Sequence, residues 1–296
     1  MAFLEQVSTL VALMRRRPDN LSWPDIAIEA MEAGSAVDVW HHHVPEALIE
    51  APGEVTPASV TVDVQAWAAA GLQMIPITDP RYPERLKGVH QAPPLIFTKG
   101  KLLPDDTGIC VVGSRNASER GRGFAADIAR ELAGREISVV SGLARGIDTA
   151  AHRAALDAGG RTVAVIGTGI TRAYPAENAA LQDQIATRGL LLSQFWPDAP
   201  PQKHTFLQRN ATMSGYALAT VVVETGETSG ARAQARMAVE HGRQVILTDQ
   251  VVNGNEWARA LVGRAGVHTA GSVAAVMNTV EDIVNMWDQA RSWMNG

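Results

Sequence analysis

The sequence predicts an α/β fold in which a doubly wound, mostly parallel sheet carries helices on both faces. Three short apolar runs, each typical of a buried parallel strand, end in glycine or small polar residues: 109–112 before Gly113, 137–140 before Ser141, and 162–166 before Gly167. The alternation of such runs with helical stretches favours a doubly wound parallel sheet. The glycine-containing ends mark its carboxyl edge, where ligands bind.

A small helical module is expected to precede the sheet, with residues 1–70 forming the module and residues 71–296 the sheet domain. Near the start, apolar residues recur at helical spacing. Ser22 stands before Trp23 and Pro24, which is typical of a helix N-terminus. Prolines and a glycine in the stretch 50–57 indicate a boundary loop between the two parts.

The sheet domain alternates strands and helices along the chain. Prolines border the segment 92–100, which favours an edge strand of the main sheet. Phe124, Ile128 and Leu132 are spaced by four, which predicts a helix over 117–133. Further strands are expected at 190–192, 219–224 and 244–247, and further helices from about 143, up to about 187, from 206, and over 231–240, 255–261 and 272–285.

The composition is that of a globular protein with one large and one smaller domain. Hydrophobic residues make up 46% and charged residues 19% of 296 residues. The one cysteine, Cys110, excludes a disulfide framework within the chain and is compatible with a reducing cytoplasm. No apolar stretch approaches the roughly 20 residues that a membrane span needs. We therefore expect a soluble, cytoplasmic protein without membrane contact.

Two arginines, Arg115 and Arg145, stand at the glycine-containing turns of the carboxyl edge. Guanidinium groups and free backbone N–H groups both suit anions, so a phosphate-bearing ligand is expected. A formal net charge of -5 argues against bulk electrostatic binding of nucleic acid. A local groove with a few arginines can still bind single strands.

Asp148 is interpreted as a cap that accepts backbone N–H groups of its own loop, rather than as a catalytic base. For His152, a structural hydrogen bond is favoured over a dyad with Asp148. Two interpretations stay open for Tyr174, which could stack on a base or close the sheet edge. Glu224 is either a site carboxylate or an ion-pair partner of Arg209, with the ion pair slightly favoured.

Five segments occur in a characteristic order and spacing. They are Gly113-Ser114-Arg115, SGLARGIDTAAHRAAL at 141–156, GGRTVAVIGTGITRAYPAEN at 159–178, Phe206 with Arg209-Asn210, and Glu224 with Ser229-Gly230. This pattern resembles the DNA-processing protein A (DprA/Smf) family over roughly residues 73–275. The resemblance implies an extended Rossmann-like domain that binds single-stranded DNA, usually as a homodimer, and helps to load a RecA-type recombinase in transformation or recombination. The family is not known for a reaction, so no enzyme activity is expected.

The resemblance also assigns a DNA- and phosphate-binding role to individual positions. The candidate site residues are Gly113, Ser114, Arg115, Ser141, Gly142, Arg145, Gly146, Gly167, Gly169, Arg209, Asn210, Ser229 and Gly230. Backbone N–H groups and arginines in such a row would hold successive phosphates. No catalytic residue, metal or cofactor is expected.

The chain departs from the family pattern at several positions. Gln194 stands where the family usually has a glutamate, and Ala211 where a second arginine is common. The stretch 231–235 replaces a more apolar stretch that contains Thr-Ala, and Thr248-Asp249 replaces a Pro-Gly turn. No winged-helix tail is recognised in the sequence. These changes indicate a divergent branch.

Two other functions are compatible with the same fold. The pocket could serve a sensor of a nucleotide-derived ligand that acts with a partner effector, with defence as a candidate setting. An enzyme such as a nucleoside-monophosphate phosphoribohydrolase is disfavoured, because the stretch 224–230 lacks that group's Pro-Gly-Gly-x-Gly-Thr block.

Overall fold

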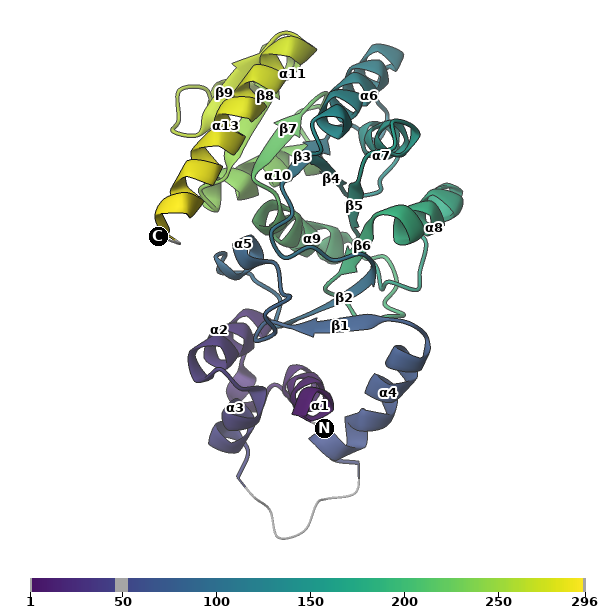
Figure 1. The fold of residues 1–296 in the computed structure, drawn as a ribbon, viewed down its shortest axis with the longest axis vertical. Coiled ribbons are helices and arrows are strands. Elements are labelled where there is room, and N and C mark those ends of the chain that lie inside the picture. Colours follow the sequence, from purple (N-terminus) through teal and green to yellow (C-terminus); the bar gives the residue numbers. More distant parts are fainter. Residues whose placement is uncertain (1, 46–52, 295–296) are drawn as a thin grey trace.

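The computed structural model describes residues 2–45 and 53–294, so residues 50–52 of the expected boundary loop lie outside the described residues. One nine-stranded sheet has the order β1-β2-β6-β5-β4-β3-β7-β8-β9 (Figure 1). The strands are β1 (Gln73–Pro76), β2 (Leu95–Gly100), β3 (Gly108–Val112), β4 (Ser138–Ser141), β5 (Thr162–Val165), β6 (Leu190–Ser193), β7 (Ala219–Val222), β8 (Gln244–Thr248) and β9 (Val267–Ala270). The predicted doubly wound, mostly parallel sheet is confirmed.

The strands from β3 to β9 pair in parallel, whereas β2 is antiparallel to both β1 and β6. The prediction that the segment 92–100 forms an edge strand was wrong, because β1 pairs with β2 and takes the edge itself. Pro93 and Pro94 precede β2 and therefore remove no N–H group from its ladders.

Helices flank the sheet on both faces and also form the N-terminal module. The helices of the described residues are α1 (Ala2–Arg16), α2 (Trp23–Ala33), α3 (Ala36–His43), α4 (Pro57–Ala69), α5 (Glu84–Lys87), α6 (Glu119–Gly134), α7 (Ile147–Asp157), α8 (Ala179–Arg188), α9 (Lys203–Tyr216), α10 (Gly230–Glu240), α11 (Asp249–Gly254), α12 (Glu256–Arg259) and α13 (Val273–Met294), with short 3-10 turns at Pro18–Asn20 and Ala176–Asn178. None of the helices described is both long and apolar enough to cross a membrane.

Alternate residues of β3 face two different hydrophobic clusters. Ile109 and Val111 pack with α6, α7 and α13, whereas Cys110 and Val112 pack in the cluster that includes α9 and α10. Such packing on both sides explains why the strand is apolar throughout. Burial raises the pKa of the Cys110 thiol, which is therefore inert.

The N-terminal helices lie at one end of the molecule beside β1 and β2, and α13 lies at the other end (Figure 1). Ser22 caps α2 as expected, because its hydroxyl accepts the N–H of Asp25. Aromatic rings join the module to the sheet domain. Trp67 lies 5.3 Å from Phe97 and 5.9 Å from Trp196, measured between ring centroids. The helices and the sheet therefore share one core.

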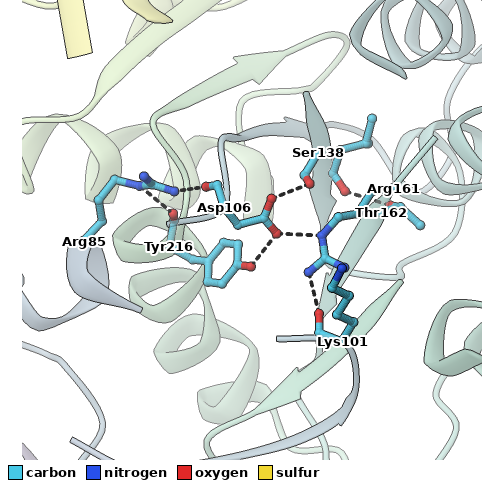
Figure 2. Close-up of polar contacts among 8 residues, drawn as sticks. Arg85, Lys101, Asp106, Ser138, Arg161, Thr162 and Tyr216 are labelled. Atoms are coloured by element: carbon cyan, nitrogen blue, oxygen red, sulfur yellow. Dashed lines mark hydrogen bonds and ion pairs between the residues drawn. The ribbon is translucent and has the colours of Figure 1, made fainter. Parts of the chain in front are cut away.

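A buried polar network fixes the amino ends of the central strands (Figure 2). Figure 2 shows the Asp106 carboxylate between three donors. They are the Ser138 hydroxyl at 2.5 Å, Arg161 Nε at 2.9 Å and the Tyr216 hydroxyl at 2.7 Å. Arg85 donates to the backbone carbonyls of Tyr216 and Asp106. Because Tyr216 ends α9, the network anchors this helix to the sheet.

Candidate functional site

The chain leaves β3 and β7, which are neighbours in the sheet, toward opposite sides. The following strands β4 and β5 lie on one side, and β8 and β9 lie on the other. A ligand is expected at such a switch point, outside the carboxyl ends of the strands. A pocket of about 750 Å³ lies there, lined by the loops after β3 and β7 and by α9.

The pocket has an exposed mouth and a buried polar floor. Arg115, Lys203, Leu207 and Thr228 are exposed lining residues. The floor holds four polar side chains that are at most 6% exposed, those of Asp148, Arg209, Asn210 and Gln234. A ligand entering the pocket would pass cations first and then reach hydrogen-bonding groups.

The turn between β4 and α7 is held by Asp148. Its carboxylate accepts the N–H of Gly142 at 3.1 Å and that of Ala144 at 3.3 Å, so the predicted capping role is confirmed. Leu143, between them, is buried and has a left-handed backbone with φ of 58°. The Asn178 side chain donates to the Leu143 carbonyl at 2.9 Å and supports this strained turn.

Arg209 ties this turn to β5 from below. Its Nη1 donates to the carbonyls of Gly142 at 2.8 Å and Val165 at 2.6 Å. Burial lowers the pKa of Arg209, while the nearby Asp148 favours the charged guanidinium. Burial likewise raises the pKa of Asp148, and Arg209 opposes that shift. The two charges compensate each other, so Arg209 shapes the floor instead of offering a free cation.

The mouth carries an aromatic pair with a cation above it. The rings of Tyr174 and Phe206 are 5.5 Å apart with an interplanar angle of 38°. The Arg115 guanidinium lies 5.4 Å from the Phe206 ring centroid. Tyr174 thus packs on Phe206 while remaining 42% exposed. This geometry is compatible with both of the interpretations of Tyr174.

Lys203 is a lining residue that the sequence reasoning missed. It begins α9 and shares a helix face with Phe206 and Leu207, three and four residues later. This spacing was the signal that could have identified it. Among the described residues, neither Lys203 nor Arg115 forms an ion pair with an acidic side chain.

Arg145 points elsewhere. Its Nη2 lies 2.8 Å from the Glu177 carboxylate, and both side chains are about half exposed. Arg145 does not line the pocket. The sequence placed no acid near it other than Asp148, because Glu177 comes from a distant loop.

The second and third glycine turns support the pocket from behind. A Cβ at Gly142 would overlap the Arg209 guanidinium, one at Gly146 the Ser114 carbonyl, and one at Gly169 the carbonyls of the Trp196–Pro197 segment. A Cβ at Gly167 would lie 2.5 Å from the Phe206 ring. These glycines therefore allow close packing of the walls, and none of the four lines the pocket.

Of the remaining expected residues, most line the pocket, and Ser141 supports the strands behind it. Gly113, Ser114, Asn210, Ser229 and Gly230 line the pocket, together with Arg115 and Arg209. The buried Ser141 hydroxyl donates to the Val111 carbonyl at 2.7 Å. Ser229 caps α10 by accepting the N–H of Ala231.

Glu224 and His152 have partners outside the pocket. The Glu224 carboxylate accepts the N–H of Ser118 at 2.8 Å and its hydroxyl at 2.5 Å, so the expected ion pair with Arg209 is not formed. His152 Nδ1 lies 2.6 Å from the Thr162 hydroxyl, which confirms the structural hydrogen bond over a dyad with Asp148. No group of acids, histidines or cysteines in the described ranges is arranged to hold a metal ion.

Comparisons with known proteins identify relatives of this chain. The family model described as DNA recombination-mediator protein A matches residues 73–288. DNA processing protein DprA of Bacillus subtilis is 38% identical over 61% of this chain and 62% of its own length. The DprA protein of Streptococcus pneumoniae is 37% identical over 72% of this chain and 74% of its own.

Solved structures show the same fold. The X-ray structure of DNA processing protein A from Streptococcus pneumoniae matches with a TM-score of 0.65 at 29% identity, over 87% of this chain and 98% of that one. A structure of DNA processing protein A from Helicobacter pylori, which addresses its single-stranded DNA binding mode, matches with a TM-score of 0.63 at 23% identity. The match covers 71% of this chain and 96% of that one. The family model matches well over half of the residues of this chain. The chain therefore belongs to the DNA recombination-mediator protein A family, also called DprA/Smf.

Proposed function

We propose that this protein binds single-stranded DNA at the pocket between β3, β7 and α9. The observation that carries the proposal is the mouth, where Arg115 and Lys203 flank the ring pair of Tyr174 and Phe206 without an acidic partner in the described part of the chain. Proteins hold single strands with cations for the phosphates and aromatic rings for the bases. Membership of the DNA-processing family supports the same ligand, as does the single-stranded DNA binding of the Helicobacter pylori relative.

The proposed binding is local and sensitive to salt. With a net charge of -5, the whole molecule repels a polyanion, so the attraction comes from the few cations at the mouth. Each phosphate that a cation neutralises releases counterions. For single strands, each such contact steepens the slope of log K against log[salt] by about 0.7. Duplex DNA offers no free base faces to the rings and is expected to bind less well.

The proposal includes the biological setting that family membership suggests. The protein would act in the cytoplasm as a homodimer, and would hand the bound strand to a RecA-type recombinase. We propose binding without a reaction, because Asp148, the acid of the floor, is occupied by two backbone N–H groups. In the proposed division, residues 71–296 bind the strand, and residues 1–70 form a helical module that shares its core with the sheet domain.

A nucleotide-derived ligand with a partner effector is the second candidate. It is favoured by the size of the pocket, which falls in the usual range of sites for small ligands, and by the buried polar floor. Such a ligand would compete with a short oligonucleotide for one site.

The test is fluorescence anisotropy with a labelled oligo-dT at two salt concentrations. We expect Arg115→Ala and Lys203→Ala each to weaken binding about tenfold and to lower the salt slope by about 0.7, because one phosphate contact is lost. The matched control is Arg130→Ala, which removes another exposed arginine, on α6, whose partner is Asp127.

Unchanged binding by both pocket variants would refute the proposed site. Binding of a mononucleotide with no affinity for the oligonucleotide would favour the second candidate.

A further inference from the structure

Gln234 is the unexplained group of the pocket. It lies on α10, lines the floor and is 1% exposed. Both amide atoms, Oε1 and Nε2, are buried and have no hydrogen-bond partner within the described ranges. Buried amides are nearly always paired in folded proteins, because leaving them unpaired is destabilising. A doubly unpaired amide in a pocket therefore points to a ligand that pairs with it.

Its neighbours on the floor are already engaged. Asn210 donates to the Gly230 carbonyl at 3.4 Å and accepts from Arg209 Nε at 3.2 Å. The Asp148 carboxylate accepts two backbone N–H groups. Gln234 is thus the residue of the floor whose donor and acceptor both lack a hydrogen-bond partner among the described residues.

The chemistry of the amide selects the ligand. A glutamine side chain presents one donor and one acceptor side by side, and a half turn of the amide exchanges them. The Watson–Crick edge of every nucleobase also presents a donor next to an acceptor, whereas in a duplex this edge is occupied by the opposite base. An amide that pairs with this edge accepts any unpaired base and rejects paired ones.

We propose that Gln234 pairs with the Watson–Crick edge of one nucleobase inserted into the pocket, and so restricts the site to single strands. This inference rests on the proposed function. The strand would keep its phosphates at Arg115 and Lys203, and the base would pass Phe206 to reach the floor.

Pairing requires the Gln234 side chain to rotate toward the pocket, because neither amide atom is exposed in the free protein. Rotation breaks no hydrogen bond, since the amide has none among the described residues. A base that pairs with the amide therefore replaces no hydrogen bond of the described residues.

The inference is tested with two oligonucleotides, oligo-dT and the same length of N3-methylthymidine. Methylation blocks the Watson–Crick edge but keeps the phosphates and the aromatic face. We expect the wild-type protein to bind the methylated strand about tenfold more weakly, as for the loss of a paired base contact. Gln234→Met should bind both strands equally, at the level of the methylated one.

The matched control is Gln182→Met. Gln182 is another buried glutamine with an unpartnered Oε1, but it lies on α8 and outside the pocket. This variant should keep the tenfold preference for the unmodified strand. If the effect of base methylation disappears in Gln234→Met but persists in Gln182→Met, it comes from the contact between Gln234 and the base and not from a general weakening of binding.

Thermal unfolding checks the premise without a ligand. Gln234→Met should melt at the same or a higher temperature than wild type, because it replaces an unpaired amide by an apolar group of similar length. A lower melting temperature would contradict the premise, since it would reveal a structural partner for the amide.

The outcomes separate this inference from the proposed function. Equal wild-type binding of both strands would overturn the role of Gln234 and leave single-strand binding intact. Failure of the folded protein to bind oligo-dT would overturn both.

Discussion

The two arginines of the pocket, Arg115 and Arg209, have opposite environments. Arg209 is buried and donates to two backbone carbonyls, whereas Arg115 is exposed and rests on Phe206. Sequence alone gives both the same expectation, because both occur in motifs at the carboxyl edge. The difference arises from the path of α9, which carries Arg209 beneath the turn of residues 142–146. Residue type therefore predicts that both arginines lie near the carboxyl edge, and tertiary structure decides that Arg115 is exposed and that Arg209 is bonded to backbone carbonyls.

Arg145 and Lys203 illustrate the same limit. Arg145 stands in a motif, but an acid from a distant loop, Glu177, pairs with it. Lys203 belongs to none of the five family segments, yet α9 brings it to the mouth beside Phe206. The pairing of Arg145 with Glu177 joins segments far apart in the sequence and cannot be inferred from spacing within either one, whereas the spacing of Lys203 and Phe206 could have indicated their shared helix face.

Stability should fall in mild acid because of His152. The Thr162 hydroxyl donates to the Val139 carbonyl, so it accepts from the Nδ1–H group of His152. Burial, with a smaller effect of Arg209, lowers the pKa of His152 to about 3. The unfolded chain takes up a proton below about pH 6.5, whereas the folded one does not. The contribution of the neutral His152 to the free energy of unfolding is thus complete above about pH 6.5 and is lost as the pH falls toward 3.

Urea unfolding at pH 7 and pH 5 measures this effect. His152 alone should contribute a loss of up to about 1.4 kcal/mol per pH unit in the free energy of unfolding. His152→Leu should show a shallower pH dependence but keep the share of His241, whose pKa burial lowers to about 4. An identical pH dependence in both proteins would contradict the account.

At the scale of elements, the turn into α7 depends on a glycine. Gly146 has φ of 75°, and a Cβ there would overlap the Ser114 carbonyl, next to Arg115. Gly159 has nearly the same φ of 74°, but a Cβ there would meet no atom within 4 Å. Gly146 also has a ψ of -118°, outside the left-handed helical region, so both backbone strain and crowding oppose a side chain there.

Gly159→Ala should lower the free energy of unfolding by about 1 kcal/mol, which is the cost of a left-handed alanine. Gly146→Ala should cost at least about 2 kcal/mol more, because the Ser114 loop must move and because the backbone at Gly146 is less accessible to alanine. Chemical denaturation measures both changes. Equal losses would show that the close approach to Ser114 has no energetic consequence.

The anchor of α9 at Asp106 gives a second prediction for an element. The Tyr216 hydroxyl donates to a charged carboxylate, whereas the equally buried Tyr82 hydroxyl donates to the neutral carbonyl of Pro93, both at 2.7 Å. Tyr216→Phe should therefore lose about 2 kcal/mol and Tyr82→Phe about 1 kcal/mol in the free energy of unfolding. A larger loss for Tyr82→Phe would argue against a charged Asp106 network.

The elements that sequence predicted best are the buried strands. The runs at β3, β4, β5 and β7 are apolar because helices cover both faces. Elements that it missed, such as β9 and α11, have weaker signals. β9 is partly exposed and lacks an apolar run, and α11 is a short helix, capped by Thr248, in a stretch for which no helix was expected.

At the scale of the whole molecule, the helical module and the sheet should unfold together. Trp196, in the loop after β6, contacts Trp23 and Trp67 from the module and Phe97 from β2. One hydrophobic cluster covers both parts. Denaturation followed by far-UV circular dichroism and by tryptophan fluorescence should therefore give one coincident transition.

Trp196→Ala should lower the midpoint of that transition, with a loss of about 3 kcal/mol. Two separate transitions in the wild-type protein would mean that the module folds independently of the sheet.

The central claim concerns the ligand of the pocket, and one measurement tests it most directly. Wild-type protein is titrated against labelled oligo-dT and against the corresponding duplex at low and moderate salt. The account predicts binding of the single strand in preference to the duplex, weakening as salt rises, because cations and aromatic rings at the mouth hold phosphates and unpaired bases. Failure of the folded protein to bind the single strand at low salt, or equal binding of the duplex, would contradict it.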